Sequence, residues 1–164
     1  MNKQTVATAI DWGAFSRRCV CIDTEVALGR APQTVFDYVT TPALWHTWHP
    51  ATAEVRDVPN RPLTRGETML EVIAMLGQRD EALWTVLACA APQRWEIVTD
   101  TVRGSAHITY LITPAPDGCR FHRRLAFRSK TLPWRWLDST LLRMVLERQS
   151  AHALRNLASV LGRT

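Results

Sequence analysis

Arg123 is the residue whose position most clearly suggests chemistry. Residues 119–128 alternate apolar and polar side chains, as a half-buried strand does, and Arg123 lies on the apolar face with Cys119, Phe121, Leu125 and Phe127. A guanidinium in apolar surroundings needs a carboxylate partner or the anionic group of a ligand. The sequence therefore predicts a ligand-binding role for Arg123 and an apolar contact for Phe121. In the alternative interpretation, a bulge moves Arg123 to a solvated rim, or Glu71 or Glu96 pairs with it.

Two residues of a C-terminal helix extend this site. Leu146 lies on the apolar stripe of that helix and is expected to line the same interior. Gln149 lies on the stripe between Leu146 and Ala153, where its amide could orient a carbonyl or hydroxyl of a ligand. Alternatively, Gln149 bonds to backbone or faces a gap filled with solvent.

Candidate acids and bases are few. A catalytic role is open only for His49, His107, Tyr110 and Arg123. His107 and Tyr110 lie on a central expected strand, and both are expected to line the interior as ligand-binding residues. No nucleophile elbow, phosphate-binding loop or paired carboxylate motif accompanies them. No helical His-x-x-x-His or Glu-x-x-His pattern gathers metal ligands. We therefore expect no metal and no cofactor, and the sequence assigns no catalytic residue.

Four tryptophans are expected to wall the same interior. Trp84 and Trp95 are in phase with the apolar residues of two neighbouring strands, and Trp45 and Trp48 belong to a short helix that would cap them. Tryptophan offers a large, rigid apolar contact that suits planar or acyl ligands. Ordinary core packing explains each of these tryptophans equally well.

The elements that must position these residues follow from periodicity and turn signals. Period-two alternation and separating turns predict strands at 20–28, 53–58, 68–76, 79–89, 94–101, 105–113 and 119–128. Residues 114–118, Pro-Ala-Pro-Asp-Gly, form the clearest hairpin turn. Helical spacing predicts short helices at 30–40 and 42–48. A helix of about 28 residues is expected after Pro133, because no further proline or glycine occurs before Gly162.

This order predicts an α+β fold of the helix-grip type. A curved antiparallel sheet of about six or seven strands would surround the long C-terminal helix, with two short helices after the first strand. Such a sheet and helix tend to leave an apolar cavity between them, which is a common form of ligand pocket. Residues 1–17 lack periodicity and are expected to form a loose leader, followed by a single domain over 18–164.

Three short motifs carry a resemblance to a known family. Ala31-Pro32, Val35-Phe36 and Trp48-His49-Pro50 resemble the opening of the START-like superfamily, also called the SRPBCC or polyketide cyclase and dehydrase group. Residues 117–120, Asp-Gly-Cys-Arg, resemble its last hairpin, although threonine is more usual at Cys119. The resemblance covers about residues 18–162. It implies the helix-grip scaffold, which lipid carriers, polyketide cyclases and quinone-binding proteins share, and leaves the function open.

The distribution of charge limits the kinds of binding partner that we expect for the protein. The net charge is +5, and residues 120–148 alone carry eight basic against two acidic residues. That segment reads as a solvated surface, or as a contact for an anionic ligand, a lipid headgroup surface or a partner protein. No nucleic-acid recognition motif accompanies it. Trp134 and Trp136, beside Arg135, could touch a membrane transiently or fasten the helix to the sheet.

The sequence also predicts a cellular compartment and a general function. No apolar run suits a secretory signal or a bilayer span, and the four cysteines show no paired motif, so a cytoplasmic location with reduced thiols is expected. A carrier or sensor of a hydrophobic lipid, polyketide or quinone-like ligand requires least and is preferred. A polyketide cyclase or dehydratase, and a partner-binding module using residues 120–148, remain alternatives. The oligomeric state is left undetermined.

Overall fold

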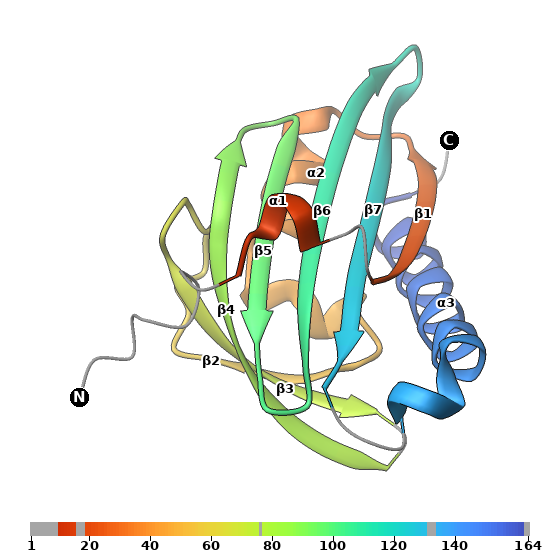
Figure 1. Ribbon diagram of the computed structural model, residues 1–164. Coiled ribbons are helices and arrows are strands. Elements are labelled where there is room, and N and C mark those ends of the chain that lie inside the picture. Colours follow the sequence, from red (N-terminus) through yellow and green to blue (C-terminus); the bar gives the residue numbers. More distant parts are fainter. Residues whose placement is uncertain (1–9, 16–18, 76, 131–133, 163–164) are drawn as a thin grey trace.

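The computed structural model describes residues 10–15, 19–75, 77–130 and 134–162 (Figure 1). One antiparallel sheet of seven strands dominates it, in the spatial order β1-β7-β6-β5-β4-β3-β2. The strands are β1 (Val20–Leu28), β2 (Thr52–Arg56), β3 (Thr68–Met75), β4 (Gln78–Ala90), β5 (Arg94–Asp100), β6 (Gly104–Ala115) and β7 (Gly118–Ser129). The helices are α1 (Trp12–Phe15), α2 (Pro32–Val39), the 3-10 helix η2 (Pro42–Thr47) and α3 (Trp134–Leu161).

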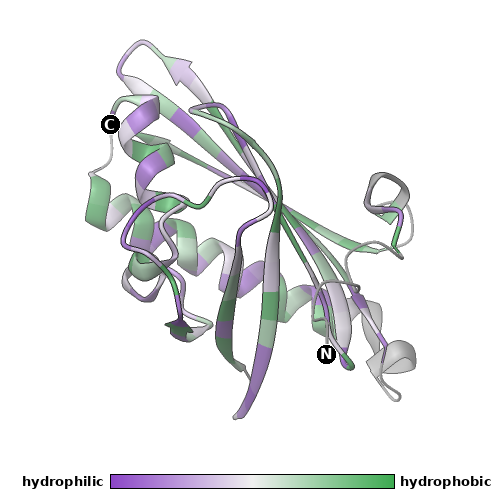
Figure 2. Ribbon diagram, turned by 90° about the vertical axis from the view of Figure 1, so that its left-hand side faces the viewer, coloured by the Kyte–Doolittle hydropathy of each residue, from purple (hydrophilic) through white to green (hydrophobic). Residues whose placement is uncertain are grey.

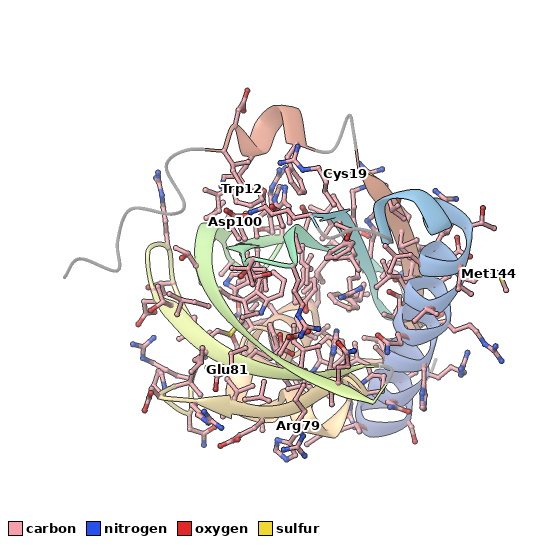
Figure 3. The ribbon with its side chains drawn as sticks, turned by 60° about the horizontal axis from the view of Figure 1, so that its bottom comes forward. Trp12, Cys19, Arg79, Glu81, Asp100 and Met144 are labelled. Atoms are coloured by element: carbon pink, nitrogen blue, oxygen red, sulfur yellow. The ribbon has the colours of Figure 1, made fainter. Side chains whose placement is uncertain are left out.

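The sheet is strongly curved and encloses the side chains of its inner face (Figure 3). α3 packs along β1, while α2 and η2 lie on the same inner side, toward β6, β7 and β2. The predicted α+β helix-grip architecture is therefore confirmed, including the two short helices after the first strand and the long C-terminal helix. Each predicted strand forms, with its ends shifted by no more than a few residues.

Alternation along the strands decides which side chains face inward, and apolar and polar residues alternate visibly along them (Figure 2). On β7, Phe121, Arg123 and Leu125 are buried, whereas Arg120 and Arg124 are exposed. β7 pairs with β1 on one side and β6 on the other without a break in register. No bulge therefore moves Arg123 outward, and the solvated-rim alternative for this residue is wrong.

The core fills the space between the inner face of the sheet and the helices. Its largest buried side chains include Trp45, Trp48, Trp95, Tyr110 and Phe121. The Trp45 indole donates a hydrogen bond to the Val39 carbonyl at 2.9 Å, and the Trp95 indole donates one to the Leu63 carbonyl at 2.9 Å. Truncating a buried aromatic residue of this kind typically costs about 3–5 kcal/mol. These rings are therefore structural as well as close to the site described below.

The short helix α1 was not expected from the sequence. Trp12 and Phe15 are buried on the outer face of the sheet, where they pack with Val98 and Ala126. Figure 1 shows α1 lying across β5 and β6 on that face. Part of the expected loose leader is thus ordered, and residues 1–9 and 16–17 lie outside the described residues. Four residues form a single helical turn, which is too short for periodicity to reveal.

α3 presents a narrow buried stripe to the interior. Leu146, Ala153 and Leu157 lie on it, as the spacing predicts, and Leu161 rather than Val160 continues it. Gln149 is only half-buried at the edge of the stripe, and the neighbouring Ser150 is the polar residue inside. No helix in the described part of the chain is long and apolar enough to cross a membrane.

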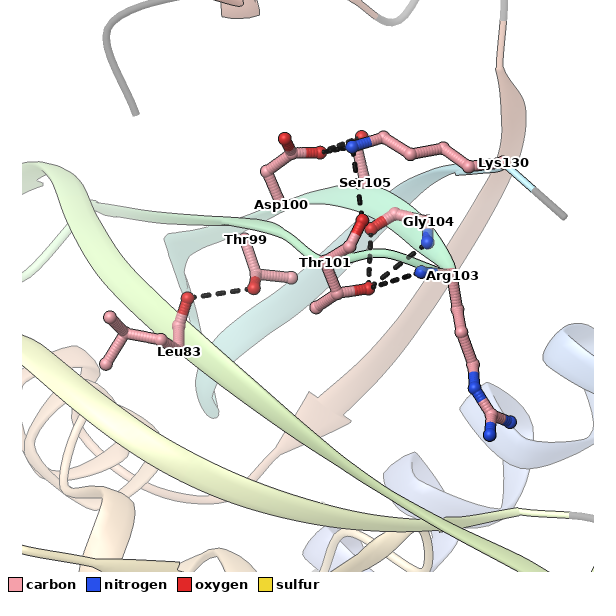
Figure 4. A network of polar contacts seen from close by, with 8 residues as sticks. All are labelled: Leu83, Thr99, Asp100, Thr101, Arg103, Gly104, Ser105 and Lys130. Carbon is pink, nitrogen blue, oxygen red and sulfur yellow. Dashed lines mark hydrogen bonds and ion pairs between the residues drawn. The ribbon is translucent and has the colours of Figure 1, made fainter. Parts of the chain in front are cut away.

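Much of the basic segment is neutralised at the surface. Arg120 pairs with Glu25 at 2.8 Å, and Arg124 pairs with Asp23 at 2.9 Å. Lys130 pairs with Asp100, which also accepts a hydrogen bond from Ser105, where β5 turns into β6 (Figure 4). Exposed pairs of this kind stabilise little. These contacts favour the solvated-surface interpretation, whereas the side chains of Trp134, Arg135 and Trp136 lie outside the described residues.

Candidate functional site

Arg123 lies in the interior, at the centre of a polar group. Its side chain is 3% exposed. One terminal nitrogen donates to the Ser150 hydroxyl of α3 at 3.0 Å, and the other lies 3.2 Å from Nε2 of His49, which follows η2. Among the described ion pairs, none joins Arg123 to a carboxylate. A buried guanidinium is thus held by two neutral groups, although its charge would be better balanced by an anion.

The contact with Arg123 fixes the protonation of His49. A guanidinium only donates hydrogen bonds, so Nε2 of His49 must accept and the proton resides on Nδ1. Burial, reinforced by the neighbouring Arg123 charge, lowers the pKa of His49 to about 3. The ring is therefore neutral near pH 7, and its Nδ1–H has no partner among the described residues.

This tautomer leads to a direct prediction. We expect the His49 ring to stay neutral from pH 8 to pH 5, with its nitrogen resonances showing the proton on Nδ1. Nitrogen-15 NMR across that range, with the signals assigned by their loss in His49→Asn, measures it. A ring that gains a proton near its ordinary pKa of about 6.5 would contradict the assigned contact with Arg123.

Four buried polar atoms make no hydrogen bond of good geometry in the described structure: Trp48 Nε1, His49 Nδ1, Tyr110 OH and Arg123 Nε. The Tyr110 hydroxyl and the Arg123 side chain nevertheless interact with each other through a weaker hydrogen bond. They belong to residues that contact one another. The Trp48 ring lies 5.4 Å from the His49 ring and 6.2 Å from the Tyr110 ring, and Tyr110 stands directly opposite Arg123 in the β6–β7 register. Native interiors contain few such atoms, so four in one place require an explanation.

All four atoms can donate a hydrogen bond. The indole, the guanidinium and the Nδ1–H of His49 only donate, and the Tyr110 hydroxyl can donate or accept. Burial raises the pKa of Tyr110 to about 12, although the Arg123 charge and a side-chain hydrogen bond with Arg123 oppose that rise, so the hydroxyl keeps its proton. The group therefore lacks acceptors, and a carboxylate or carbonyl oxygen is what would complete it.

A buried carboxyl group, Glu71 of β3, lies near this group without an ion pair to Arg123. Its oxygens accept hydrogen bonds from the Thr52 hydroxyl and, at 2.8 Å, from the Trp84 indole. Burial raises the pKa of Glu71, whereas the two hydrogen bonds and the Arg123 charge lower it. In the alternative interpretation of the sequence, Glu71 pairs with Arg123. The structure shows an electrostatic interaction between these residues and no direct ion pair. Glu96, the other candidate partner, lies on the outer face of the sheet.

His107 does not line the interior, and that expectation is wrong. Its ring lies on the outer face, 2.7 Å from a Glu96 oxygen and 6.1 Å from the Trp12 ring. The reason is parity, because Tyr110 and His107 are three residues apart on one strand and must face opposite sides of the sheet. Arg94 also pairs with Glu96, so this outer cluster is satisfied internally.

The other predicted site residues are gathered inside. The interior holds Trp45, Trp48, Trp84, Trp95, Tyr110, Phe121, Arg123 and Leu146. Gln149 stands at the edge, away from the described contacts of Arg123. Sequence reasoning missed Ser150, and it considered His49 and Glu71 without placing them in the site. Ser150 follows Leu146 by four residues, so helical spacing alone could have placed it on the buried stripe.

Two surface pockets of the described structure lie away from the space between the inner face of the sheet and α3. The first, of about 400 Å³, is on the outer face beside Trp12, His107 and Arg124. The second, of about 520 Å³, lies between α2, η2 and the loop at Asn60. The interior where the sequence places the ligand cavity is occupied by aromatic rings around the Arg123 group. A ligand would therefore have to displace some of these rings.

Comparison with known proteins identifies the family. The model of the polyketide cyclase / dehydrase and lipid transport family matches residues 20–162. The chain belongs to this family. Membership in it is consistent with binding of a hydrophobic ligand and with cyclase-type chemistry, and specifies neither a ligand nor a reaction. No curated protein matches the sequence.

Several solved structures resemble the chain closely in shape and weakly in sequence. A START superfamily protein from Mycobacterium smegmatis has a TM-score of 0.72 at 13% identity, covering 86% of this chain and 96% of its own. A Thermus thermophilus protein has a TM-score of 0.71 at 12% identity, covering 85% and 94%. The di-domain ARO/CYC StfQ from the steffimycin biosynthetic pathway has a TM-score of 0.68 at 16% identity, covering 89% and 52%. At these identities the likeness establishes the fold alone.

Proposed function

We propose that the protein is a carrier or sensor for a small, largely apolar ligand whose single polar end is a carboxylate or carbonyl. The four unpartnered buried donors around Arg123 support this proposal most directly. A lipid, a polyketide or a quinone-like molecule has the required combination of an apolar body and an acceptor oxygen. The site on the inner face would hold the oxygen, and the surrounding tryptophans would contact the apolar body.

The charge of Arg123 favours a carboxylate over a carbonyl. Arg123 keeps its proton at any ordinary pH, and a buried cation without a counter-ion is costly. A carboxylate can take two hydrogen bonds from donors such as Arg123 Nε and His49 Nδ1 while neutralising the charge. A carbonyl or hydroxyl oxygen would leave the Arg123 charge without a counter-ion, and a hydroxyl would bring another donor into a group that is already short of acceptors.

Binding must also open the interior. Because Trp48, Tyr110 and Phe121 contact one another around the polar group, an incoming ligand displaces at least part of this packing. The Trp48 indole N–H has no hydrogen-bond partner in the described structure, and it would donate a hydrogen bond to the ligand. Tryptophan fluorescence should therefore report binding, and part of the binding free energy is spent on moving the rings.

A pair of ligands that differ only at the polar end tests the proposal. We expect dodecanoate to bind at least about 10-fold more tightly than 1-dodecanol, because a charge-assisted hydrogen bond exceeds a neutral one by roughly 1.4 kcal/mol or more. Titrations at pH 8 monitored by tryptophan fluorescence, with native mass spectrometry for stoichiometry, measure both affinities. Equal affinities, or no binding of either ligand, would overturn the proposal.

One observation keeps an enzymatic role as a second candidate. Tyr110 and the neutral His49 flank the Arg123 guanidinium, an arrangement that could stabilise an enolate oxygen and move a proton nearby. Such chemistry suits a polyketide cyclase or dehydratase, and a structural neighbour carries the ARO/CYC name. Incubation with a poly-β-ketone thioester separates the two roles, since a carrier returns it unchanged. A cyclase gives a cyclic aldol isomer of the same mass, and dehydration of that aldol gives a product lighter by one water.

A further inference from the structure

The interior contains two buried ionisable side chains that come from strands far apart in the sheet. Arg123 is on β7 and Glu71 is on β3, and three strands, β6, β5 and β4, separate them in the sheet. The curvature visible in Figure 3 turns these two strands toward a common interior. Both side chains are almost completely buried, at 3% and 2% exposure. Thr52, which hydrogen-bonds to Glu71, also donates its backbone N–H to the carbonyl of His49 at 3.1 Å, and His49 contacts Arg123. The Arg123 charge lowers the pKa of Glu71.

Among the described groups of this interior, Glu71 is the one whose pKa is moved toward neutral pH, because burial raises it above its ordinary value. Arg123 remains protonated, Tyr110 remains a neutral phenol and His49 remains a neutral imidazole. The direct partners of Glu71 are the Thr52 hydroxyl of β2 and the Trp84 indole of β4, which do not titrate in this range. The Thr52 hydroxyl can donate to a carboxylate or accept from a carboxylic acid, so both forms of Glu71 are accommodated.

These contacts make Glu71 the counter-charge of Arg123 when no ligand is bound. An ionised Glu71 partly balances the guanidinium from a distance, and the two hydrogen bonds stabilise the carboxylate. If a negatively charged ligand binds Arg123 directly, the interior holds two negative charges against one positive charge. In a medium of low dielectric constant that excess is unfavourable, and the nearest group able to remove it is Glu71.

We propose that Glu71 controls how tightly the site binds an anion, and that binding of an anion at Arg123 is coupled to uptake of one proton by Glu71. The inference rests on the proposed function, because it concerns the same site. With Glu71 ionised, the interior binds an anion more weakly than it does with Glu71 protonated. A neutral ligand should bind about equally well in both states.

The sign of the pH dependence follows from this coupling. Burial already raises the pKa of Glu71 above its ordinary value of 4.5, and a bound anion raises it further. Affinity for an anion therefore increases as the pH falls through the interval between these two pKa values. Within that interval the logarithm of the association constant changes by about one per pH unit, since one proton is bound. Above the interval the affinity is constant and lower.

A matched pair of fluorescent probes tests the coupling. 8-Anilinonaphthalene-1-sulfonate carries a sulfonate whose charge is constant from pH 5.5 to 8.5, and N-phenyl-1-naphthylamine is nearly the same molecule without the sulfonate. Titrations over this range should show that the anionic probe binds more tightly at lower pH and that the neutral probe does not. Because the anionic probe does not titrate, any such difference originates in the protein.

Glu71→Gln isolates the residue, since glutamine keeps the size and hydrogen-bonding capacity of the protonated carboxyl group. We expect this variant to bind the anionic probe about 10-fold more tightly than the wild type at pH 8.5, with no dependence on pH and little change for the neutral probe. Glu96→Gln is the control, because Glu96 is an equally buried carboxyl group on the outer face. It should retain the wild-type pH dependence of probe binding.

The outcomes separate this inference from the proposed function. If the anionic probe binds in a manner that needs Arg123 but shows no pH dependence, and Glu71→Gln leaves its affinity unchanged, the coupling is wrong while the Arg123 site stands. If Arg123→Leu leaves anionic binding unchanged, or no anionic probe binds, both are wrong. If Glu96→Gln abolishes the pH dependence, the coupled proton belongs to the outer cluster and the assignment to Glu71 is wrong.

Discussion

Arg123→Leu is expected to lower the affinity for dodecanoate about 100-fold, which corresponds to about 2.7 kcal/mol. The guanidinium is the only positive charge among the described groups of the interior site, and its Nε–H is one of the donors without a partner. Removing a buried charged hydrogen-bond donor from a complex typically costs 2–5 kcal/mol, because the ligand carboxylate is then desolvated without compensation. The affinity for 1-dodecanol should change far less. Fluorescence titration of both ligands measures the effect.

The same substitution should leave the fold intact. Leucine removes a desolvated cation, which favours folding, but it leaves the Ser150 hydroxyl and His49 Nε2 without their partner. These effects oppose each other, so we expect the free energy of unfolding to fall by about 2 kcal/mol or less. Urea denaturation measures this change and shows whether a loss of binding reflects the site or the stability of the domain.

Arg124→Leu is the matched control for that experiment. It changes the same residue type one position along β7, where the side chain faces the other side of the sheet and pairs with Asp23. We expect wild-type affinity for dodecanoate and a small change in stability, since exposed pairs contribute about 0–1 kcal/mol. If Arg124→Leu weakens dodecanoate binding as much as Arg123→Leu does, net positive charge rather than the interior site attracts the ligand.

The helices and strands were predictable because their signals lie within short stretches of sequence: proline and glycine mark their ends, and the alternation of side chains shows which residues share a face. Proline or glycine bounds the short helices, the last hairpin and the end of the long helix, and strands such as β7 alternate buried and less buried residues over most of their length. Parity on β7 also placed Arg123 inside correctly, since no bulge interrupts the pairing of that strand. The same rule, applied to β6, would have excluded His107 from any site that contains Tyr110.

The composition of the site was less predictable because it depends on how the sheet curves. Glu71 meets the electrostatic field of Arg123 only because strands far apart in the sheet face a common interior, and sheet curvature has no short sequence signature. His49 enters through the turn after η2, whose direction depends on packing against β2 and α3. Ser150 was missed for another reason. Serine is small, and Gln149 was the more obvious polar residue on α3.

Gly118 governs the register that holds Arg123 inside, and Gly118→Ala should destabilise the domain strongly. Gly118 begins β7 after the hairpin turn, and its backbone has φ of +142°, which side-chain-bearing residues rarely adopt. An added Cβ would overlap the Leu28 carbonyl oxygen at the end of β1 and lie 2.8 Å from the Arg30 backbone nitrogen. Both atoms belong to backbone, so neither can rotate away as the end of a side chain could.

The cost of that overlap should extend to the site. Relieving it requires the end of β1 to separate from β7, although Leu28 pairs with Cys119 there and the Arg30 side chain bonds to the Leu161 carbonyl of α3 at 2.7 Å. Strain and lost pairing together predict a decrease of about 4 kcal/mol in the free energy of unfolding. Urea denaturation measures it, and dodecanoate affinity should fall with it as β7 loses its register.

Gly66→Ala separates overlap from backbone strain. Gly66 also has positive φ, at +88°, but an added Cβ there meets nothing within 4 Å. Alanine at this position should cost only about 1–2 kcal/mol, the usual penalty of the left-handed conformation. If both alanine variants lose the same stability, the contact with β1 contributes nothing at Gly118. In that case the inward position of Arg123 does not depend on this close approach, and the alternation along β7 and its pairing with β6 are sufficient to hold it.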